Sequence, residues 1–260
     1  MFHSKSPEMF SAVLKQVGIK GEYVPFKVEK DMVGKAVESI RVLNIEGANV
    51  TVPYKELVIP HLDILSEGAN IIGSINTIVR KGKTLKGYNT NAIGFMDALN
   101  SVGFDITGKR ALVFGTGGIA RAVVFILNWL RAESIHIAGR NMGKALEIGK
   151  RLGGETVQMD ELQERAPAVD LVINATAVSS PEESSELAEL VRNIPFTDCR
   201  MIYDLNYGRA VNFWQETAQR QKIPFMDGLS ALAYQAKRTF ALWTGVQVPA
   251  EVFLKTLQAE

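Results

Sequence analysis

Cysteine, histidine, excess charge of either sign and long apolar runs are all scarce in this 260-residue sequence. The single cysteine, Cys199, excludes a disulfide within the chain and agrees with a reducing compartment. With 29 basic and 28 acidic residues, the net charge of +1 gives no electrostatic reason to expect nucleic acid or an anionic membrane as partner. The longest apolar run, 122–130, is far shorter than the roughly 20 residues of a membrane-spanning helix.

These absences predict a soluble, cytoplasmic protein that acts on a small molecule, binds neither nucleic acid nor membrane, and holds no metal. A monomer and a homodimer both fit the sequence. Helical and strand patterns alternate along the chain, which predicts an α/β fold with mostly parallel sheets. Expected helices cover 7–17, 30–43, 91–102, 122–130, 230–244 and 250–258. Expected strands cover 23–28, 47–52, 76–81, 85–88, 111–114, 134–139, 171–174, 201–204 and 223–226.

The most informative segment is a glycine turn between a strand pattern (111–114) and an apolar helix pattern (122–130). In this G-x-G-x-x-A context, Gly115 lets the chain reverse and Gly117 lets backbone amides approach a pyrophosphate. Ala120 lets the helix pack closely on its strand. The free N–H groups and partial positive charge of the helix start favour an anion. The turn therefore predicts a dinucleotide site in a Rossmann-like unit.

The end of the next strand indicates which dinucleotide is bound. NAD-selective sites usually carry an acidic residue there, which holds the ribose 2′-hydroxyl. This chain has Arg140 instead, 140 − 115 = 25 residues after the first glycine, with Lys144 one helical turn later. A guanidinium suits a 2′-phosphate, so the pattern predicts NADP. The alternative is that Arg140 is a solvated cation at a helix start.

Lys55 lies just beyond the strand pattern that Pro53 ends. A lysine at the carboxyl end of a strand, facing a nicotinamide, can protonate or stabilise a carbonyl oxygen during hydride transfer. Most lysines, however, are solvated surface charges. Other polar residues also have simple structural alternatives: Ser6 and Asn91 could cap helices, and Gln235 could belong to the polar face of its helix.

Several further motifs occur in a fixed order along nearly the whole chain: His3-Ser-Lys-Ser-Pro7, Asn49-Val-Thr-Val-Pro-Tyr-Lys55, Gly73-Ser-Ile-Asn-Thr77, Gly87-Tyr-Asn-Thr-Asn91, the glycine turn, Asn174-Ala-Thr176, Gly228-Leu-Ser-Ala-Leu-Ala-Tyr-Gln-Ala236 and Phe240-Ala-Leu-Trp-Thr-Gly245. Together they resemble the shikimate dehydrogenase family. A methylenetetrahydrofolate dehydrogenase also pairs a lysine with a Rossmann domain, but the first two motifs argue against it.

The resemblance implies NADPH-dependent reduction of 3-dehydroshikimate to shikimate, a step of aromatic amino-acid biosynthesis. It also implies a two-domain α/β fold. Residues 91–227 would form an NADP-binding Rossmann domain with a doubly wound parallel sheet. Residues 1–90 plus 228–260 would form a smaller α/β substrate-binding domain, completed by the C-terminal helices.

The resemblance assigns roles residue by residue. Lys55 matches the catalytic lysine, and Asn91 stands where its partner is expected. The residues that would bind substrate are Ser4, Ser6, Thr51, Lys55, Asn76, Asn91, Tyr207 and Gln235. Those that would surround the pyrophosphate are Gly115, Thr116, Gly117, Gly118, Ile119 and Ala120. Those that would face the 2′-phosphate are Arg140, Asn141 and Lys144, and those on the nicotinamide side are Thr176, Ala177, Leu205 and Gly228.

The main departure from the family pattern is Asn91, where the family has an aspartate. An amide cannot take a proton at neutral pH, and it supplies no negative charge to hold Lys55 protonated. Acid–base help is typically worth roughly 10²–10⁴-fold, so we expect a slow enzyme. The alternatives are a non-catalytic or regulatory NADP-binding relative, and a relative that acts on quinate or an aminated analogue.

Smaller departures lie elsewhere. The family has a strand before the H-S-x-S-P motif, and without it neighbouring strands would lose a ladder of hydrogen bonds. Gly139 replaces the asparagine before Arg140, Ala231 replaces a methionine, and the segment from Ala177 replaces Ser-x-Gly. These changes touch the nicotinamide and adenine ends of the cofactor.

Overall fold

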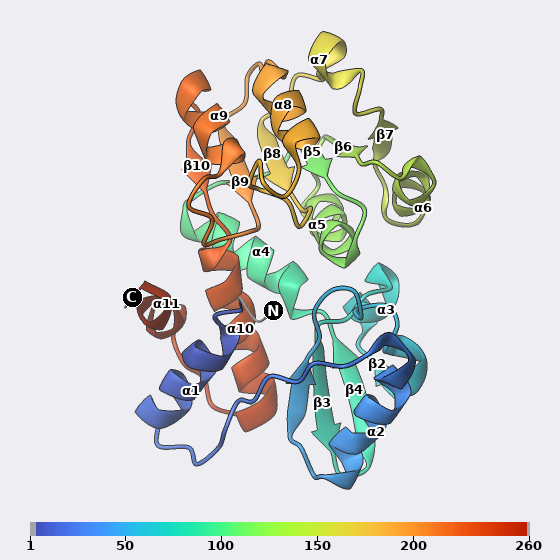
Figure 1. Ribbon diagram of the computed structural model, residues 1–260, viewed down its shortest axis with the longest axis vertical. Coiled ribbons are helices and arrows are strands. Elements are labelled where there is room, and N and C mark those ends of the chain that lie inside the picture. The colour runs from blue at the N-terminus through green and yellow to red at the C-terminus, as the bar shows by residue number, and fades with distance from the viewer. Residues whose placement is uncertain (1–3, 259–260) are drawn as a thin grey trace. The chain divides into compact units, whose positions relative to one another are not determined.

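The computed structural model describes residues 4–258, which form two compact units (Figure 1). One unit combines the chain up to Ala98 with the chain from Ser230 onward, and the other is Leu99–Leu229. The divisions fall inside helix α4 (Thr90–Ser101) and at the start of α10 (Leu229–Thr244). Among the described residues, no helix is long and apolar enough to cross a membrane. The predicted two-domain α/β fold is confirmed.

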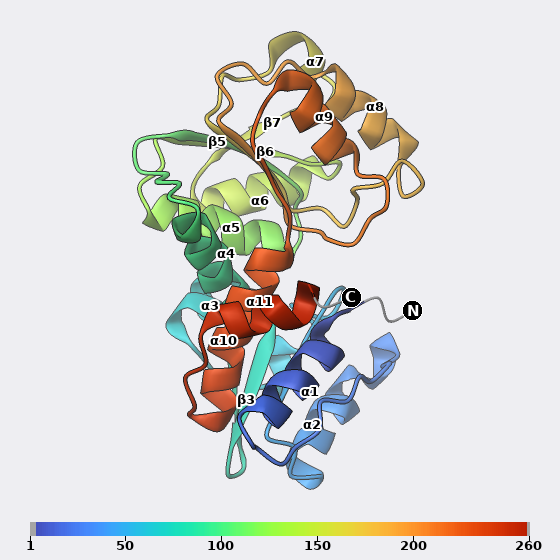
Figure 2. The same cartoon turned by 90° about the vertical axis from the view of Figure 1, so that its left-hand side faces the viewer.

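The second unit is a doubly wound sheet of parallel strands in the order β10-β9-β8-β5-β6-β7. The strands β5, β8 and β9 are buried along their whole length apart from Arg110, as expected for parallel strands covered on both faces. Helices α5 and α6 cover one face, and α8 and α9 cover the other (Figure 2). The elements are β5 (Arg110–Phe114), α5 (Gly118–Trp129), β6 (Ser134–Ala138), α6 (Met142–Leu152), β7 (Glu155–Val157), α7 (Leu162–Arg165), β8 (Leu171–Asn174), α8 (Ser185–Asn193), β9 (Met201–Asp204), α9 (Phe213–Gln221) and β10 (Phe225–Met226).

The core of this unit fixes where its strands end. Phe114, the last residue of β5, packs against Trp214 of α9 with 4.9 Å between ring centroids. Val172 and Ile202 from the neighbouring strands belong to the same buried cluster. Such contacts hold the strands in register, so that β5, β8 and β9 end side by side at Phe114, Asn174 and Asp204.

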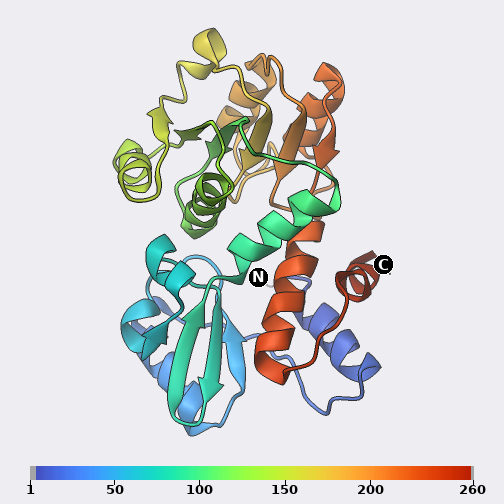
Figure 3. The same ribbon diagram turned by 180° about the vertical axis from the view of Figure 1, so that it is seen from behind.

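The first unit contains a mixed sheet in the order β1-β3-β4-β2. Helix α2 packs one face through Val33, Val37 and Ile40. Helix α10 lies along the other face of the hairpin β3–β4 (Figure 3), and the indole of its Trp243 donates to the Ile78 carbonyl at 2.9 Å. The elements are α1 (Ser6–Gln16), the 3-10 helix η1 (Lys30–Met32), α2 (Val33–Val42), β1 (Gly47–Asn49), the 3-10 helix η2 (Ile59–His61), β2 (Ile64–Leu65), α3 (Glu67–Ile72), β3 (Thr77–Lys81), β4 (Thr84–Tyr88) and α11 (Ala250–Gln258), with α1 and α11 side by side (Figure 2).

Two strand predictions in the first unit are corrected. The segment 23–28 has no regular secondary structure; side-chain bonds hold it instead, from the Tyr23 hydroxyl to Asn49 Oδ1 at 3.0 Å and from the Tyr54 hydroxyl to the Val28 carbonyl. Strand β1 ends at Asn49 rather than at residue 52, because the chain enters a turn closed by the Tyr54 N–H and the Thr51 carbonyl. No strand among the described residues pairs with the outer edge of β1.

Candidate functional site

The predicted cofactor residues lie in the loops at one edge of the six-stranded sheet. Because its strands are parallel, their carboxyl ends meet at the same edge. The glycine turn follows β5, Arg140 follows β6, Thr176 and Ala177 follow β8, Leu205 follows β9, and Gly228 follows β10. The structure therefore gathers these residues around the ends of five neighbouring strands.

The glycine turn has the shape of an anion cradle. Gly115 has φ of +121°, and a Cβ there would lie 2.7 Å from the Ala175 carbonyl oxygen, so only glycine fits. Gly117 is the N-cap of α5, where no side chain caps the first N–H groups. A Cβ at Gly117 would meet no atom within 4 Å, which leaves open space beside those donors. The turn fits a pyrophosphate.

The loop after β6 presents cations. Arg140 and Lys144 are exposed, and no described residue pairs with either side chain. Asn141 has a structural role, because its Oδ1 accepts from the Lys144 N–H at 3.0 Å and caps α6. Gly139 lies against Thr116: a Cβ at Gly139 would come 2.6 Å from the Thr116 Cγ2. This contact gives a physical reason for the glycine before Arg140.

The loops after β8, β9 and β10 are held by internal bonds. The Thr176 hydroxyl donates to Asn174 Oδ1 at 2.7 Å, so this side chain is engaged within its own loop. A Cβ at Gly228 would lie 2.3 Å from the Leu205 carbonyl oxygen, which requires glycine. Ala177 is exposed, whereas Tyr207, the predicted substrate residue of this unit, is partly buried.

In the first unit, three predicted site residues meet in one polar cluster. The Asn76 Nδ2 lies 3.2 Å from Asn91 Oδ1 and 3.1 Å from Gln235 Oε1. The cluster continues through three hydroxyls that sequence reasoning missed as a set, those of Thr77, Thr90 and Thr239, spaced 3.0 to 3.1 Å apart. A partial signal was present: Thr77 interrupts an apolar run, and Thr239 lies four residues after Gln235, on the same face of a helix. Thr90 lies between two asparagines and has no such signal of its own.

The bonds in and beside this cluster rule out two structural alternatives, namely that Asn91 caps a helix and that Gln235 belongs to a solvated helix face. Asn91 does not cap α4, because Asn89 Oδ1 accepts from the Ala92 N–H at 3.1 Å and performs that role. Gln235 is not a solvated residue of a polar face, since it is only 7% exposed and bonded within the cluster. The Asn91 Nδ2 is buried and has no hydrogen-bond partner among the described residues. Position 91 thus carries a donor with nothing to receive it.

Lys55 is the buried cation of this unit. It is 7% exposed, and burial lowers the pKa of its ammonium to about 8. Its carbonyl accepts from the Ile75 N–H at 2.9 Å, which ties it to the residue before Asn76. No described carboxylate forms an ion pair with Lys55. A lysine with this pKa exchanges its proton near neutral pH, as acid–base catalysis requires.

The remaining predicted substrate residues of the first unit, Thr51, Ser4 and Ser6, lie outside the polar cluster. Thr51 is exposed in the turn after β1. Ser6 is the first residue of α1 and does not cap it, because the N-cap position is Lys5, whose side chain makes no capping bond; the capping alternative is therefore wrong. The Ser6 N–H donates to the Ser4 hydroxyl at 3.3 Å. His3, from the same motif, lies outside the described residues.

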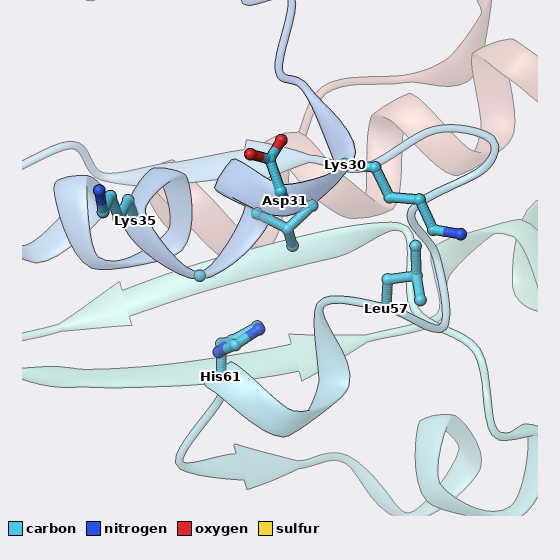
Figure 4. Close-up of a pocket in the computed structure, with 7 residues that line it drawn as sticks. Lys30, Asp31, Lys35, Leu57 and His61 are labelled. Atoms are coloured by element: carbon cyan, nitrogen blue, oxygen red, sulfur yellow. The ribbon is translucent and has the colours of Figure 1, made fainter.

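A hollow of about 470 Å³ lies elsewhere in the first unit (Figure 4). It shares no residue with the predicted site. Its lining combines the start of α2 with the segment before β2: Lys30, Asp31, Val33, Gly34, Lys35, Leu57 and His61. Within residues 4–258, no group of three or more histidine, cysteine or acidic side chains could hold a metal ion.

Comparison with known proteins gives a consistent result along the chain. The family models for the shikimate dehydrogenase substrate binding domain, shikimate / quinate 5-dehydrogenase and the shikimate 5′-dehydrogenase C-terminal domain match residues 1–78, 97–230 and 228–258. A shikimate dehydrogenase (NADP(+)) from Caldanaerobacter subterraneus is 35% identical over 94% of this chain and 88% of its own. One from Desulforamulus reducens is 36% identical over 99% and 91%.

Solved structures agree with these relatives. The crystal structure of shikimate 5-dehydrogenase from Thermus thermophilus, in complex with NADP(H) and shikimate, has a TM-score of 0.86 and 30% identity, covering 99% of this chain and 95% of its own. The enzyme from Aquifex aeolicus has the same TM-score at 28% identity and covers 98% of this chain and 93% of its own.

Proposed function

The chain belongs to the shikimate dehydrogenase family, and we propose that it catalyses the NADP-dependent interconversion of 3-dehydroshikimate and shikimate. The proposal places this step in the cytoplasm, within aromatic amino-acid biosynthesis. It assigns substrate binding to residues 1–90 with 228–260 and cofactor binding to residues 91–227. The protein would act as a monomer or a homodimer.

The observation that carries the proposal is Lys55. A buried lysine whose pKa is about 8 is a proton donor and acceptor near neutral pH. It is joined through Ile75 to the polar cluster of Asn76, Asn91 and Gln235. Amides that both donate and accept suit the several hydroxyls of a polyol ring and would hold it in one orientation.

The proposal gives the predicted catalytic and substrate residues separate parts in the reaction. When bound, NADPH supplies the hydride. In the reducing direction, the Lys55 ammonium donates a proton to the oxygen that becomes negatively charged; in the oxidising direction, the neutral amine accepts the hydroxyl proton. Ser4, Ser6 and Thr51 would contact the substrate from the N-terminal segments, and Tyr207 would contribute from the loop after β9.

The cofactor assignment uses groups that the fold leaves open. The uncapped N–H groups after Gly117 would hold the pyrophosphate, with Thr116, Ile119 and Ala120 lining the same turn. The unpaired side chains of Arg140 and Lys144 would hold the 2′-phosphate, and Asn141 would fix the helix start between them. The loops of Thr176, Ala177, Leu205 and Gly228 would border the nicotinamide.

We further propose that Asn91 slows turnover. A carboxylate at this position would still accept from Asn76, and it would place an acceptor where the unpartnered Nδ2 now lies. The loss of that charge leaves the buried Lys55 ammonium without a counterion. The same free donor favours the alternative of a substrate with an extra acceptor at this point, such as a quinate-type ring. A binding protein without turnover is the other outcome.

The decisive experiment measures initial rates with shikimate and with quinate, each with NADP and with NAD, through the absorbance of the reduced nicotinamide. We expect the highest kcat/KM for shikimate with NADP. Binding of both ligands by calorimetry without turnover would support the non-catalytic alternative. Preference for quinate would reassign the substrate, and preference for NAD would contradict the role given to Arg140.

A further inference from the structure

A single carboxylate joins the loops at the carboxyl edge of the six-stranded sheet. Asp204, the last residue of β9, is fully buried. Its Oδ1 accepts from Asn174 Nδ2 at 2.8 Å and from the Asn206 N–H and Nδ2, both at 3.0 Å. Its Oδ2 accepts from Asn212 Nδ2 at 2.7 Å. These three asparagines come from the end of β8, the loop after β9 and the start of α9.

Two of these asparagines, Asn174 and Asn206, hold the loop after β8. Asn174 Oδ1 accepts from the N–H and the hydroxyl of Thr176 at 3.1 and 2.7 Å. Asn206 Nδ2 lies 2.9 Å from the Thr176 carbonyl oxygen and 2.9 Å from the Ser179 hydroxyl. Asp204 is therefore linked, through one asparagine in each case, to both ends of the turn that carries Thr176 and Ala177.

These loops press on the glycines of the proposed cofactor site. The carbonyl oxygen of Ala175 lies 2.7 Å from where a Cβ of Gly115 would be, and that of Leu205 lies 2.3 Å from where a Cβ of Gly228 would be. The neighbouring residues, Asn174 and Asp204, are the bonded pair at the strand ends. Because these approaches are close, a shift of the loop after β8 would change the surroundings of Gly115, and a shift of the loop after β9 would change those of Gly228.

The charge of Asp204 is held by donors alone. Every described hydrogen bond to it comes from an N–H or hydroxyl donor, so the ionised carboxylate is the form whose bonds are complete. The Asp227 carboxylate also interacts with Asp204 electrostatically and opposes its charge. Burial raises its pKa, while bonds from Ser179, Asn206, Asn212 and Asn174 act in the opposite direction. No described cation pairs with it. An asparagine at this position would turn one oxygen into a donor that faces other donors.

We infer that Asp204 is a positioning residue, which fixes the loops after β8 and β9 in the shape that the cofactor requires. The inference rests on the proposed NADP site. Asp204 acts on this site through Asn174 and Asn206, whose bonds hold Thr176 and Leu205 in place.

The test compares two buried carboxylates of one sheet. Asp170 lies at the opposite edge, before β8, where it is 7% exposed and accepts from the Arg110 N–H at 3.0 Å and Nε at 3.1 Å. Asp204→Asn and Asp170→Asn both remove a buried charge, and both are expected to lower the melting temperature. Dissociation constants for NADP are measured by calorimetry without substrate, on wild type and on both folded variants.

We expect Asp204→Asn to raise the Kd for NADP at least ~10-fold, because small displacements of binding groups have large effects. Asp170→Asn should leave it within about 2-fold, as expected for a distant, independent site. In turnover, Asp204→Asn should raise the KM for NADP while the KM for shikimate stays near wild type. A merely structural role would lower the folded fraction and leave these constants unchanged in the folded protein.

A second variant covers a failure of Asp204→Asn to fold. Asn206→Ala keeps the carboxylate and its bonds to Asn174 and Asn212, and removes the links to Thr176 and Ser179. It should weaken NADP by a smaller factor, ~3-fold or more. Unchanged affinity in a folded Asp204→Asn or Asn206→Ala, or equal weakening by Asp170→Asn, would overturn the inference. Wild type that binds no NADP would instead refute the proposed cofactor site.

Discussion

The polar cluster of the first unit and the carboxyl edge of the sheet in the second unit use buried polarity in different ways. The cluster around Asn76 is neutral; among the residues that the structure describes, its Asn91 Nδ2 has no acceptor, and Lys55 of the same unit has no carboxylate counterion. The edge around Asp204 is anionic, and each asparagine amide that contacts this carboxylate is bonded. Polar groups with complete bonds hold a shape, whereas those with incomplete bonds are available to a ligand.

In the second unit, the groups that hold the shape and the groups that are available to a ligand lie in different places. Its buried edge is internally bonded, whereas Arg140 and Lys144, two cations without a partner among the described residues, are exposed in the loop after β6 and at the start of α6. The first unit combines both kinds of group in one buried place. We therefore expect changes in the first unit to act on turnover and changes at Arg140 to act on affinity, and the following variants test that division.

The largest effect is expected for Lys55→Met, which keeps an apolar side chain of similar length in the buried site. Loss of the proton donor should lower kcat by roughly 10²–10⁴-fold, while the Kd values for shikimate and NADP change little. Steady-state kinetics and calorimetry measure the two effects. Lys81→Met, an exposed lysine at the end of β3, is the matched control. A variant that turns over normally would remove Lys55 from the chemistry.

Arg140→Ala should give the next largest effect. A charge-assisted bond to phosphate is worth about 1.5–3 kcal/mol, so the Kd for NADP should rise roughly 10–100-fold. The Kd for NAD should change far less, because that cofactor lacks the 2′-phosphate. Arg165→Ala, an exposed arginine of α7, is the control. Equal weakening of NAD and NADP would show that Arg140 does not contact the 2′-phosphate.

Asn91→Asp should give the smallest change, and in the opposite direction. We expect kcat for shikimate oxidation to rise at least ~10-fold with little change in ligand affinity, because the carboxylate restores acid–base help to Lys55. Asn100→Asp, an exposed position on the same helix, controls for the added charge. No gain with intact binding would reject residue 91 as the missing element.

The pH profiles of the wild-type protein and of Asn91→Asp test whether the charge of residue 91 acts on Lys55. In wild type, the oxidation rate should rise with pH and level off above about 8, where the Lys55 amine is neutral, and the reduction rate should fall over the same range. A nearby carboxylate favours the ammonium, so Asn91→Asp should move both inflections to higher pH. Inflections that stay in place would show that the two side chains do not interact.

The sequence predicted the parts of the fold that local rules control. Apolar runs of strand length, such as 111–114 and 171–174, became buried parallel strands, and the glycine turn kept its place between β5 and α5. The segment 23–28 alternates like a strand, yet it joins no ladder, because pairing depends on a neighbour that alternation alone does not identify.

The candidate site was predictable residue by residue but not as a network. The motifs singled out Asn76, Asn91 and Gln235, and the structure joins them. From the sequence, Asn91 was a candidate helix cap, because an asparagine near a helix start often caps it. In the structure Asn89 fills that role. The bonds of Asp204 join residues up to 30 positions apart, and no local pattern in the sequence indicates them.

The close approach of Gly139 to Thr116 limits how this lineage could change its cofactor. Any side chain at position 139, next to the position where an acidic residue would accept a ribose hydroxyl, would need room that the threonine methyl group already fills. A change of position 116 to a smaller residue must therefore come first or together with it. The contact makes the order of substitutions matter, so that a mutation harmful on one background is tolerated on another.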